Sequence, residues 1–183
     1  MKSPELKIFT GPMFGGKTTR MLAALERYQY QHRSTMLFKA SIDKRYSEEK
    51  VVTHKGQEHT SVLVSSGAEI LEKGLFADVV AVDELFMIPG SAAALIALLG
   101  KGKTVLASTL QLSSEPAGYK PFEEVKDLMP WATSIEVCPA VCAHCDRDAY
   151  YTQRIGNQPK QILVGGAESY QPVCWKHSLL GES

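Results

Sequence analysis

Apolar runs alternate with helix-like stretches along the chain from residue 6 to residue 107. The apolar runs are typical of buried strands, and they occupy Leu6–Phe9, Thr35–Phe38, Ser61–Val64, Asp78–Val82 and Thr104–Ala107. The stretches between them that predict helices are Thr19–Arg33, Gly67–Lys73 and Ser91–Leu99. This alternation predicts an α/β fold, in which helices flank a parallel sheet and the site lies at the carboxyl ends of the strands.

Two segments depart from this pattern. Residues 40–60 are rich in charge and poor in large apolar side chains, so we expect a long, mobile loop there. From about residue 138 the chain becomes cysteine-bearing, aromatic and rich in turns, with strand-like runs at Ala149–Arg154 and Gln161–Val164. We therefore expect a main domain over residues 1–137 and a small second domain over residues 138–183.

Composition narrows the range of functions. The 183 residues carry 20 basic and 20 acidic side chains, so no overall positive field favours a nucleic acid or an anionic membrane as partner. No apolar leader precedes Leu6, and the longest apolar-rich run, Ala92–Leu99, is too short to span a bilayer. We therefore expect a soluble, cytoplasmic protein that acts on a small molecule.

The strongest motif lies directly after the first predicted strand. Residues 11–18 read Gly-Pro-Met-Phe-Gly-Gly-Lys-Thr and match the P-loop pattern G-x-x-x-x-G-K-[ST]. Such a turn points backbone N–H groups at a phosphate, and the following helix adds its positive end. Lys17 is expected to reach the terminal phosphates and Thr18 to bind Mg²⁺, with Gly11, Gly15 and Gly16 permitting close backbone approach. The alternative is a glycine-rich turn that binds nothing.

Two acids end a later strand. The apolar run over 79–82 is followed by Asp83 and Glu84, where a P-loop enzyme needs a metal-side carboxylate and a base. We assign Asp83 to the metal side and Glu84 to accepting a proton from an attacking hydroxyl or water. The alternative is an ordinary solvated strand end.

The cysteines form a second constellation. Cys142 and Cys145 stand three residues apart, and so do Cys174 and His177, which is the ligand spacing of a closed, structural zinc site. Unliganded thiols are the alternative. Cys138 and His144 lie close enough in the chain to replace one of these ligands, and we interpret both as bystanders.

Taken together, these residues resemble the zinc-containing thymidine kinase family, of the type related to the human cytosolic enzyme. The resemblance covers nearly the whole chain. Besides the P-loop, the acid pair and the two zinc pairs, it rests on Asp43-x-Arg45-Tyr46, Gly102-Lys103-Thr104-Val105, Lys120-Pro121-Phe122, Tyr151-Thr152-x-Arg154, Gly165-Gly166-Ala167 and Tyr170.

The resemblance implies a P-loop NTPase-like domain with a small C-terminal zinc-binding lasso domain. It also implies an activity, the transfer of the ATP γ-phosphate to the 5′-hydroxyl of thymidine or deoxyuridine. The cofactors implied are ATP, Mg²⁺ and structural zinc, and the oligomer implied is a homotetramer. Glu84, Lys17 and Arg45 are then the catalytic residues, and Asp43 and Arg45, which composition alone marks as solvated, lie near the sugar and phosphates. The ATP and Mg²⁺ contacts implied are Gly11, Met13, Gly15, Gly16, Lys17, Thr18, Thr19 and Asp83. The further nucleoside contacts implied are Met13, Thr152, Gln161, Leu163 and Tyr170.

Two segments differ from the family pattern. Leu85-Phe86-Met87 follows the acid pair where the family has a small residue and Gln-Phe, and Leu110-Gln111 stands where the family has Leu-Asp. About four extra residues then precede Phe122. We place Phe86, Met87, Leu110 and Phe122 at the nucleoside, and because an altered pocket changes base preference, a kinase for another nucleoside is one alternative. A non-catalytic ATP-dependent switch is the other.

Overall fold

The fold is that of a computed structural model, which describes residues 3–42, 50–52, 58–115, 118–156 and 165–181. A six-stranded, all-parallel sheet forms its centre, with the strand order β5-β2-β6-β7-β1-β8. Its members are β1 (Leu6–Thr10), β2 (Thr35–Ala40), β5 (Val62–Val64), β6 (Val79–Asp83), β7 (Thr104–Thr109) and β8 (Ser134–Val137). The α/β fold predicted from the sequence is confirmed.

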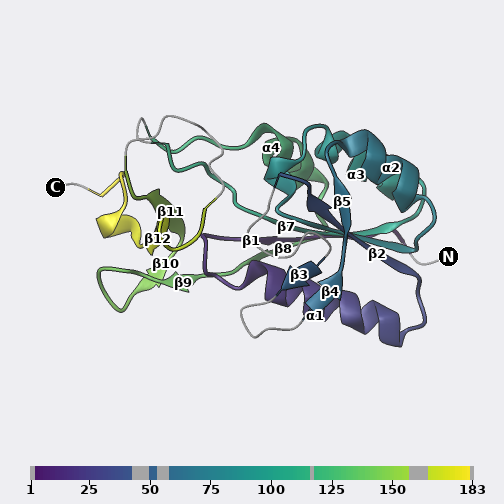
Figure 1. The fold of residues 1–183 in the computed structure, drawn as a ribbon, viewed down its shortest axis with the longest axis horizontal. Helices are drawn as coiled ribbons and strands as arrows, with labels where there is room; N and C mark the ends of the chain where they lie inside the picture. The colour runs from purple at the N-terminus through teal and green to yellow at the C-terminus, as the bar shows by residue number, and fades with distance from the viewer. Residues whose placement is uncertain (1–2, 43–49, 53–57, 116–117, 157–164, 182–183) are drawn as a thin grey trace.

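Helices cover both faces of this sheet, with α1 (Lys17–Tyr30) on one face and α2 (Gly67–Gly74), α3 (Ser91–Gly100) and α4 (Glu123–Leu128) on the other (Figure 1). Strand residues alternate between the two faces. On β6, Val80 and Val82 join the core beneath α2, α3 and α4, whereas Val79 and Ala81 join the core beneath α1. Both faces are therefore buried, which is why the strands appear in the sequence as unbroken apolar runs.

Three short antiparallel pairs complete the strands of the described chain. They are β3 (Lys50–Val52) with β4 (Glu58–Thr60), β9 (Ala140–Val141) with β10 (Asp148–Ala149), and β11 (Tyr151–Arg154) with β12 (Tyr170–Val173). Turns of 3₁₀ helix lie at η1 (Leu85–Met87), η2 (Met129–Trp131) and η3 (Trp175–His177). The strands β9 to β12 lie beyond the carboxyl ends of the sheet (Figure 1), around a small core of their own that contains Ala149 and Val173.

The structure corrects part of the prediction. Residues 40–60 are not all loop, because β3 and β4 pair there as antiparallel strands. Backbone hydrogen bonds join the two strands, and these bonds do not require the alternation of apolar and polar residues that predicts a strand from sequence. Helix α4 and strand β8 were not predicted either. The predicted strand Gln161–Val164 lies outside the described residues, and the observed partner of β11 is β12.

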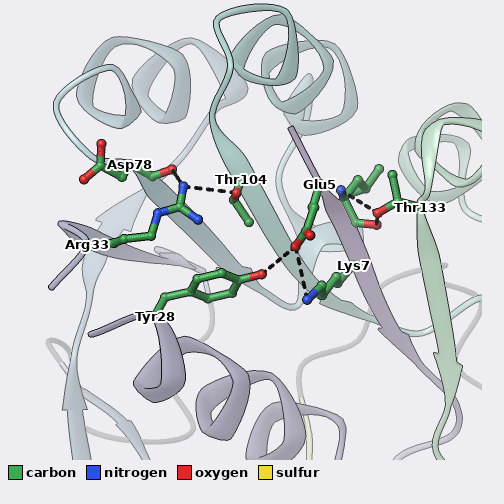
Figure 2. Close-up of polar contacts among 8 residues, drawn as sticks. Glu5, Lys7, Tyr28, Arg33, Asp78, Thr104 and Thr133 are labelled. Atoms are coloured by element: carbon green, nitrogen blue, oxygen red, sulfur yellow. Dashed lines mark hydrogen bonds and ion pairs between the residues drawn. The ribbon is translucent and has the colours of Figure 1, made fainter. Parts of the chain in front are cut away.

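A polar cluster ties the end of α1 to the amino end of the sheet, opposite the P-loop (Figure 2). The Tyr28 hydroxyl donates to Glu5 at 2.7 Å, and the Lys7 ammonium lies 3.2 Å from the same carboxylate. Arg33 donates to the Asp78 carbonyl and to the Thr104 hydroxyl. The hydrogen bond from Tyr28, followed by the one from Lys7, holds the pKa of Glu5 below its usual value.

No helix in the described part of the chain is long and apolar enough to cross a membrane.

Candidate active site and metal centre

The predicted P-loop joins β1 to α1, as its motif requires. Gly16 caps α1 with a left-handed φ of 75°, a conformation that glycine adopts without steric cost. The first turn of α1 contains no acidic residue, and Gly16 has no side chain to cap it, so the N–H groups and positive end of the helix face the loop. Lys17 is buried, and its ammonium donates to the Pro12 carbonyl at 2.7 Å. This arrangement is suited to holding an anion, and Thr19 lies in the first turn of the helix beside the loop.

The backbone of Cys138 supports this cradle from beneath. Its N–H donates to the Thr10 carbonyl at 2.7 Å, and its own carbonyl oxygen lies against Gly11 and Gly15. A Cβ built on either glycine would stand only 2.2 Å (Gly11) or 2.3 Å (Gly15) from that oxygen. These two glycines are therefore needed because another backbone approaches them closely. Sequence reasoning assigned no role to Cys138 here.

The acid pair meets the P-loop helix at the carboxyl end of β6. The Thr18 hydroxyl donates to Asp83 Oδ1 at 2.8 Å, so residues 65 positions apart in the chain are in direct contact. Asp83 is buried, whereas Glu84 is only partly buried and has a left-handed φ of 53°. That conformation is costly for a residue with a side chain and is typical of functional sites. The start of the P-loop helix and the end of β6 therefore meet at the carboxyl edge of the sheet.

A serine that the sequence analysis missed completes this arrangement. Ser108, near the end of β7, donates a hydrogen bond to Asp83 Oδ1 and accepts one from the Glu84 N–H at 3.3 Å. Close by, the Thr10 hydroxyl donates to Gln111 Oε1 at 2.7 Å, which joins the end of β1 to the segment after β7. In the sequence, Ser108 and Thr10 were marked only as polar side chains at the ends of buried strands.

The residues predicted to contact the nucleoside form several separate contacts in the structure, and four of them lie outside the described residues. The Met13 N–H donates to the Thr152 hydroxyl at 2.9 Å, which links the P-loop to β11. The rings of Phe86 and Phe122 pack 4.5 Å apart. Met87 and Leu110 pack with these rings in the same core cluster, and Tyr170 accepts a hydrogen bond from Arg154 on the buried side of β11 and β12. Asp43, Arg45, Gln161 and Leu163 lie outside the described residues.

The four predicted zinc ligands form one cluster, in which all ligand atoms lie within 4.8 Å of one another. The Sγ atoms of Cys145 and Cys174 are 3.8 Å apart, and His177 Nδ1 is 3.4 Å from the Sγ atoms of Cys142 and Cys174. A tetrahedral zinc ion with Zn–S bonds of ~2.3 Å spaces two sulfur ligands about 3.8 Å apart, so the geometry fits zinc. With four protein ligands the site is closed, which indicates a structural role.

The surroundings of the cluster favour the thiolate form of one ligand, Cys142. Burial acts to raise the pKa of Cys142, but backbone N–H donors at Cys174 and His144, together with the His177 ring, lower that pKa to about 6. The two residues interpreted as bystanders are outside the ligand set. The Cys138 thiol donates to the Glu136 carbonyl, and burial raises its pKa, while the His144 ring contacts Gln171 and packs edge-on against His177.

Comparison with known proteins agrees with these features. A model of the family described as thymidine kinase matches residues 4–178. A thymidine kinase from Pyrobaculum aerophilum is 36% identical over 185 residues, which cover 96% of this chain and 98% of the relative. One from Thermococcus kodakarensis is 37% identical over 191 residues, covering 96% and 94%. The cytosolic thymidine kinase of Homo sapiens is 29% identical over 170 residues, covering 93% of this chain and 71% of the human one. With its P-loop, its acid pair and its Cys₃His cluster in place, the chain belongs to the thymidine kinase family.

Proposed function

We propose that this protein transfers the γ-phosphate of ATP to the 5′-hydroxyl of thymidine, giving thymidine 5′-monophosphate and ADP. The observation that carries the proposal is the hydrogen bond from Thr18 to Asp83, because it places the phosphate cradle and the acid pair at one point of the sheet edge. The names of the three relatives support thymidine as the nucleoside.

Each residue of this edge has a separate part in the reaction. The P-loop amides and Lys17 hold the β- and γ-phosphates and balance the charge that spreads over the transferred group. Thr18 and Asp83 would hold Mg²⁺, which would supply positive charge to offset that of the phosphates. Glu84 accepts the proton of the 5′-hydroxyl as the new O–P bond forms, and the bond between the γ-phosphorus and the bridging oxygen breaks to release ADP. Arg45 is assigned to the same phosphates by family resemblance.

The nucleoside would lie between the P-loop and the C-terminal segment. The bond from Met13 to Thr152 supports this, since it ties the P-loop to β11 in that segment. The Cys₃His cluster would hold zinc and clamp the segment between its ligand pairs, which the resemblance identifies as the lasso over the nucleoside. The proposed boundary between the main domain and the small C-terminal domain lies between residues 137 and 138. A homotetramer is proposed from the family relationship alone. A cytosolic location is proposed because the human relative is named as the cytosolic enzyme.

The direct test uses purified protein with ATP, Mg²⁺ and each of five nucleosides: thymidine, deoxyuridine, deoxycytidine, deoxyadenosine and deoxyguanosine. We expect thymidine 5′-monophosphate to form with the highest kcat/KM, followed by the deoxyuridine product. Lys17→Met is the matched control for contaminating kinases and is expected to lack activity. A preference for another nucleoside would move the assignment to that substrate. ATP binding without any nucleoside product would favour the non-catalytic switch.

A further inference from the structure

Ser108 lies beside the acid pair because of the register of two central strands. Val82 on β6 pairs with Ala107 on β7, so the next residues along these parallel strands, Asp83 and Ser108, are neighbours at the carboxyl edge. Alternation along β7 places Ser108 on the same face as Leu106, which packs in the core beneath α1. Ser108 is 0% exposed, so its hydroxyl is shielded from water and depends on protein partners.

That hydroxyl contacts both acids. It donates to Asp83 Oδ1 and accepts from the backbone N–H of Glu84 at 3.3 Å. A serine hydroxyl has one donor and two acceptor positions, so it can make both bonds at once. The Ser108 oxygen therefore holds the metal-side carboxylate and the backbone of the base together.

The two bonds have different consequences. Asp83 Oδ1 receives hydroxyl donors from two directions, Thr18 on the P-loop helix and Ser108 on the neighbouring strand, and together they fix the rotation of the carboxylate. Glu84 has a left-handed backbone and caps the η1 turn, and the hydrogen bond to its N–H stabilises the backbone at the start of that turn. Loss of the Ser108 hydroxyl would release the carboxylate and the turn at the same time.

We propose that Ser108 is a positioning residue for phosphoryl transfer, because it lies between Asp83 and Glu84 and sets the orientation of both. The inference rests on the proposed function, in which Asp83 serves the metal ion and Glu84 the nucleoside. Ser108 is fully buried, so it would act through these two residues. Its contribution is to keep two carboxylates in the arrangement that the reaction needs, since a small displacement of such groups lowers turnover strongly.

The matched control is Ser91, a second fully buried serine with two hydrogen bonds. Its hydroxyl contacts the Leu85 carbonyl and Glu124, and not the acid pair. Ser108→Ala and Ser91→Ala therefore remove the same group from equally buried positions. Both variants are expected to lower Tm by similar amounts, and only the first is expected to change the chemistry.

The experiment measures kcat, KM for thymidine, and the Mg²⁺ concentration that gives half-maximal activity. For Ser108→Ala we expect kcat to fall ~10- to 100-fold, the thymidine KM to change less than about twofold, and the half-saturating Mg²⁺ concentration to rise severalfold. Ser91→Ala should keep all three within about twofold of the wild type. Wild-type values for Ser108→Ala, or equal losses in both variants, would overturn the proposal.

Two additions keep the test decisive. If Ser108→Ala fails to fold, Ser108→Cys keeps the side-chain volume and weakens the hydrogen bonds, and a partial loss of kcat with the same rise in Mg²⁺ demand is expected. If the wild type phosphorylates no nucleoside, the proposed function fails separately. The Mg²⁺ dependence of ATP binding by calorimetry then tests Ser108 alone. A severalfold shift in Ser108→Ala but not in Ser91→Ala supports the inference, and no shift refutes it.

Discussion

The contact between the P-loop and the Cys138 carbonyl gives the sharpest prediction. Gly15→Ala adds one methyl group, and its carbon would stand 2.3 Å from the Cys138 oxygen and 3.3 Å from the Pro12 oxygen. The backbone of Gly15 lies outside the left-handed region, so alanine can adopt its conformation and the test isolates the steric conflict. Both opposing atoms belong to the backbone and cannot rotate away as a side chain could.

The magnitude follows from the distance. A carbon and an oxygen in ordinary contact are separated by more than 3 Å, so the loop must move away from Cys138 by about 1 Å. Overpacking of this kind costs ~1–3 kcal/mol of folding free energy. A displacement of about 1 Å in a group that positions substrate can lower activity by ~100-fold. We therefore expect kcat/KM for ATP to fall roughly 100-fold and Tm to fall by several degrees.

The assay couples ADP release to thymidine phosphorylation and measures Tm on the same preparations. Gly100→Ala is the matched control, because a Cβ there meets nothing within 4 Å and Gly100 ends helix α3. Its activity should stay at the wild-type level, and its stability should be equal or slightly higher, since alanine favours the helix more than glycine does. Gly11→Ala combines the same conflict, at 2.2 Å, with a φ of 144°, and should lose at least as much as Gly15→Ala. Normal kcat/KM and Tm in Gly15→Ala would refute the reasoning.

Three further predictions concern the base, the metal and the amino end of the sheet. Glu84→Gln should leave ATP affinity nearly intact and lower turnover by roughly 100-fold, the scale of a lost general base; unchanged turnover in a steady-state assay would remove Glu84 from that role. Elemental analysis should find about one zinc per chain, and chelation should lower Tm; absence of metal together with four freely titrating thiols would contradict this. The pKa of Glu5 is lower in the folded protein than in the unfolded chain, so the ionised Glu5 stabilises the fold at pH values above the usual pKa of a glutamate. This stabilisation is lost as the pH falls through the lowered pKa. Tyr28→Phe should therefore lower Tm modestly at pH 7 and less at pH 3, and a pH-independent difference between the two proteins would count against the Glu5 pairing.

Several features were predictable because the residues that create them are close together in the chain. The P-loop occupies residues 11–18, and each zinc pair spans four residues, so local backbone geometry alone brings their groups into position. Buried parallel strands also show directly in the sequence, since residues on both faces must be apolar. The acid pair was recognisable because polar residues end such a run.

Other elements lacked a local signal. Strands β3 and β4 have only three residues each, which is too few to show a pattern of apolar positions. The edge strand β8 leaves Ile135 and Val137 half exposed, so β8 lacks the buried pattern of β6. The nucleoside contacts that rest on family resemblance were placed only in part, since the described residues include Thr152 and Tyr170 but not Gln161 or Leu163.

By itself, therefore, the sequence determined the alternating α/β architecture, the P-loop turn, the paired acids and the two pairs of the Cys₃His group, because each depends on spacing over a few residues. The tertiary structure alone decided what supports them. Thr10 and Gln111 are 101 positions apart, Thr18 and Asp83 are 65 apart, and the Cys138 carbonyl meets glycines more than a hundred residues earlier. Such contacts depend on how the strands are ordered in the sheet, and strand order has no signature in local sequence.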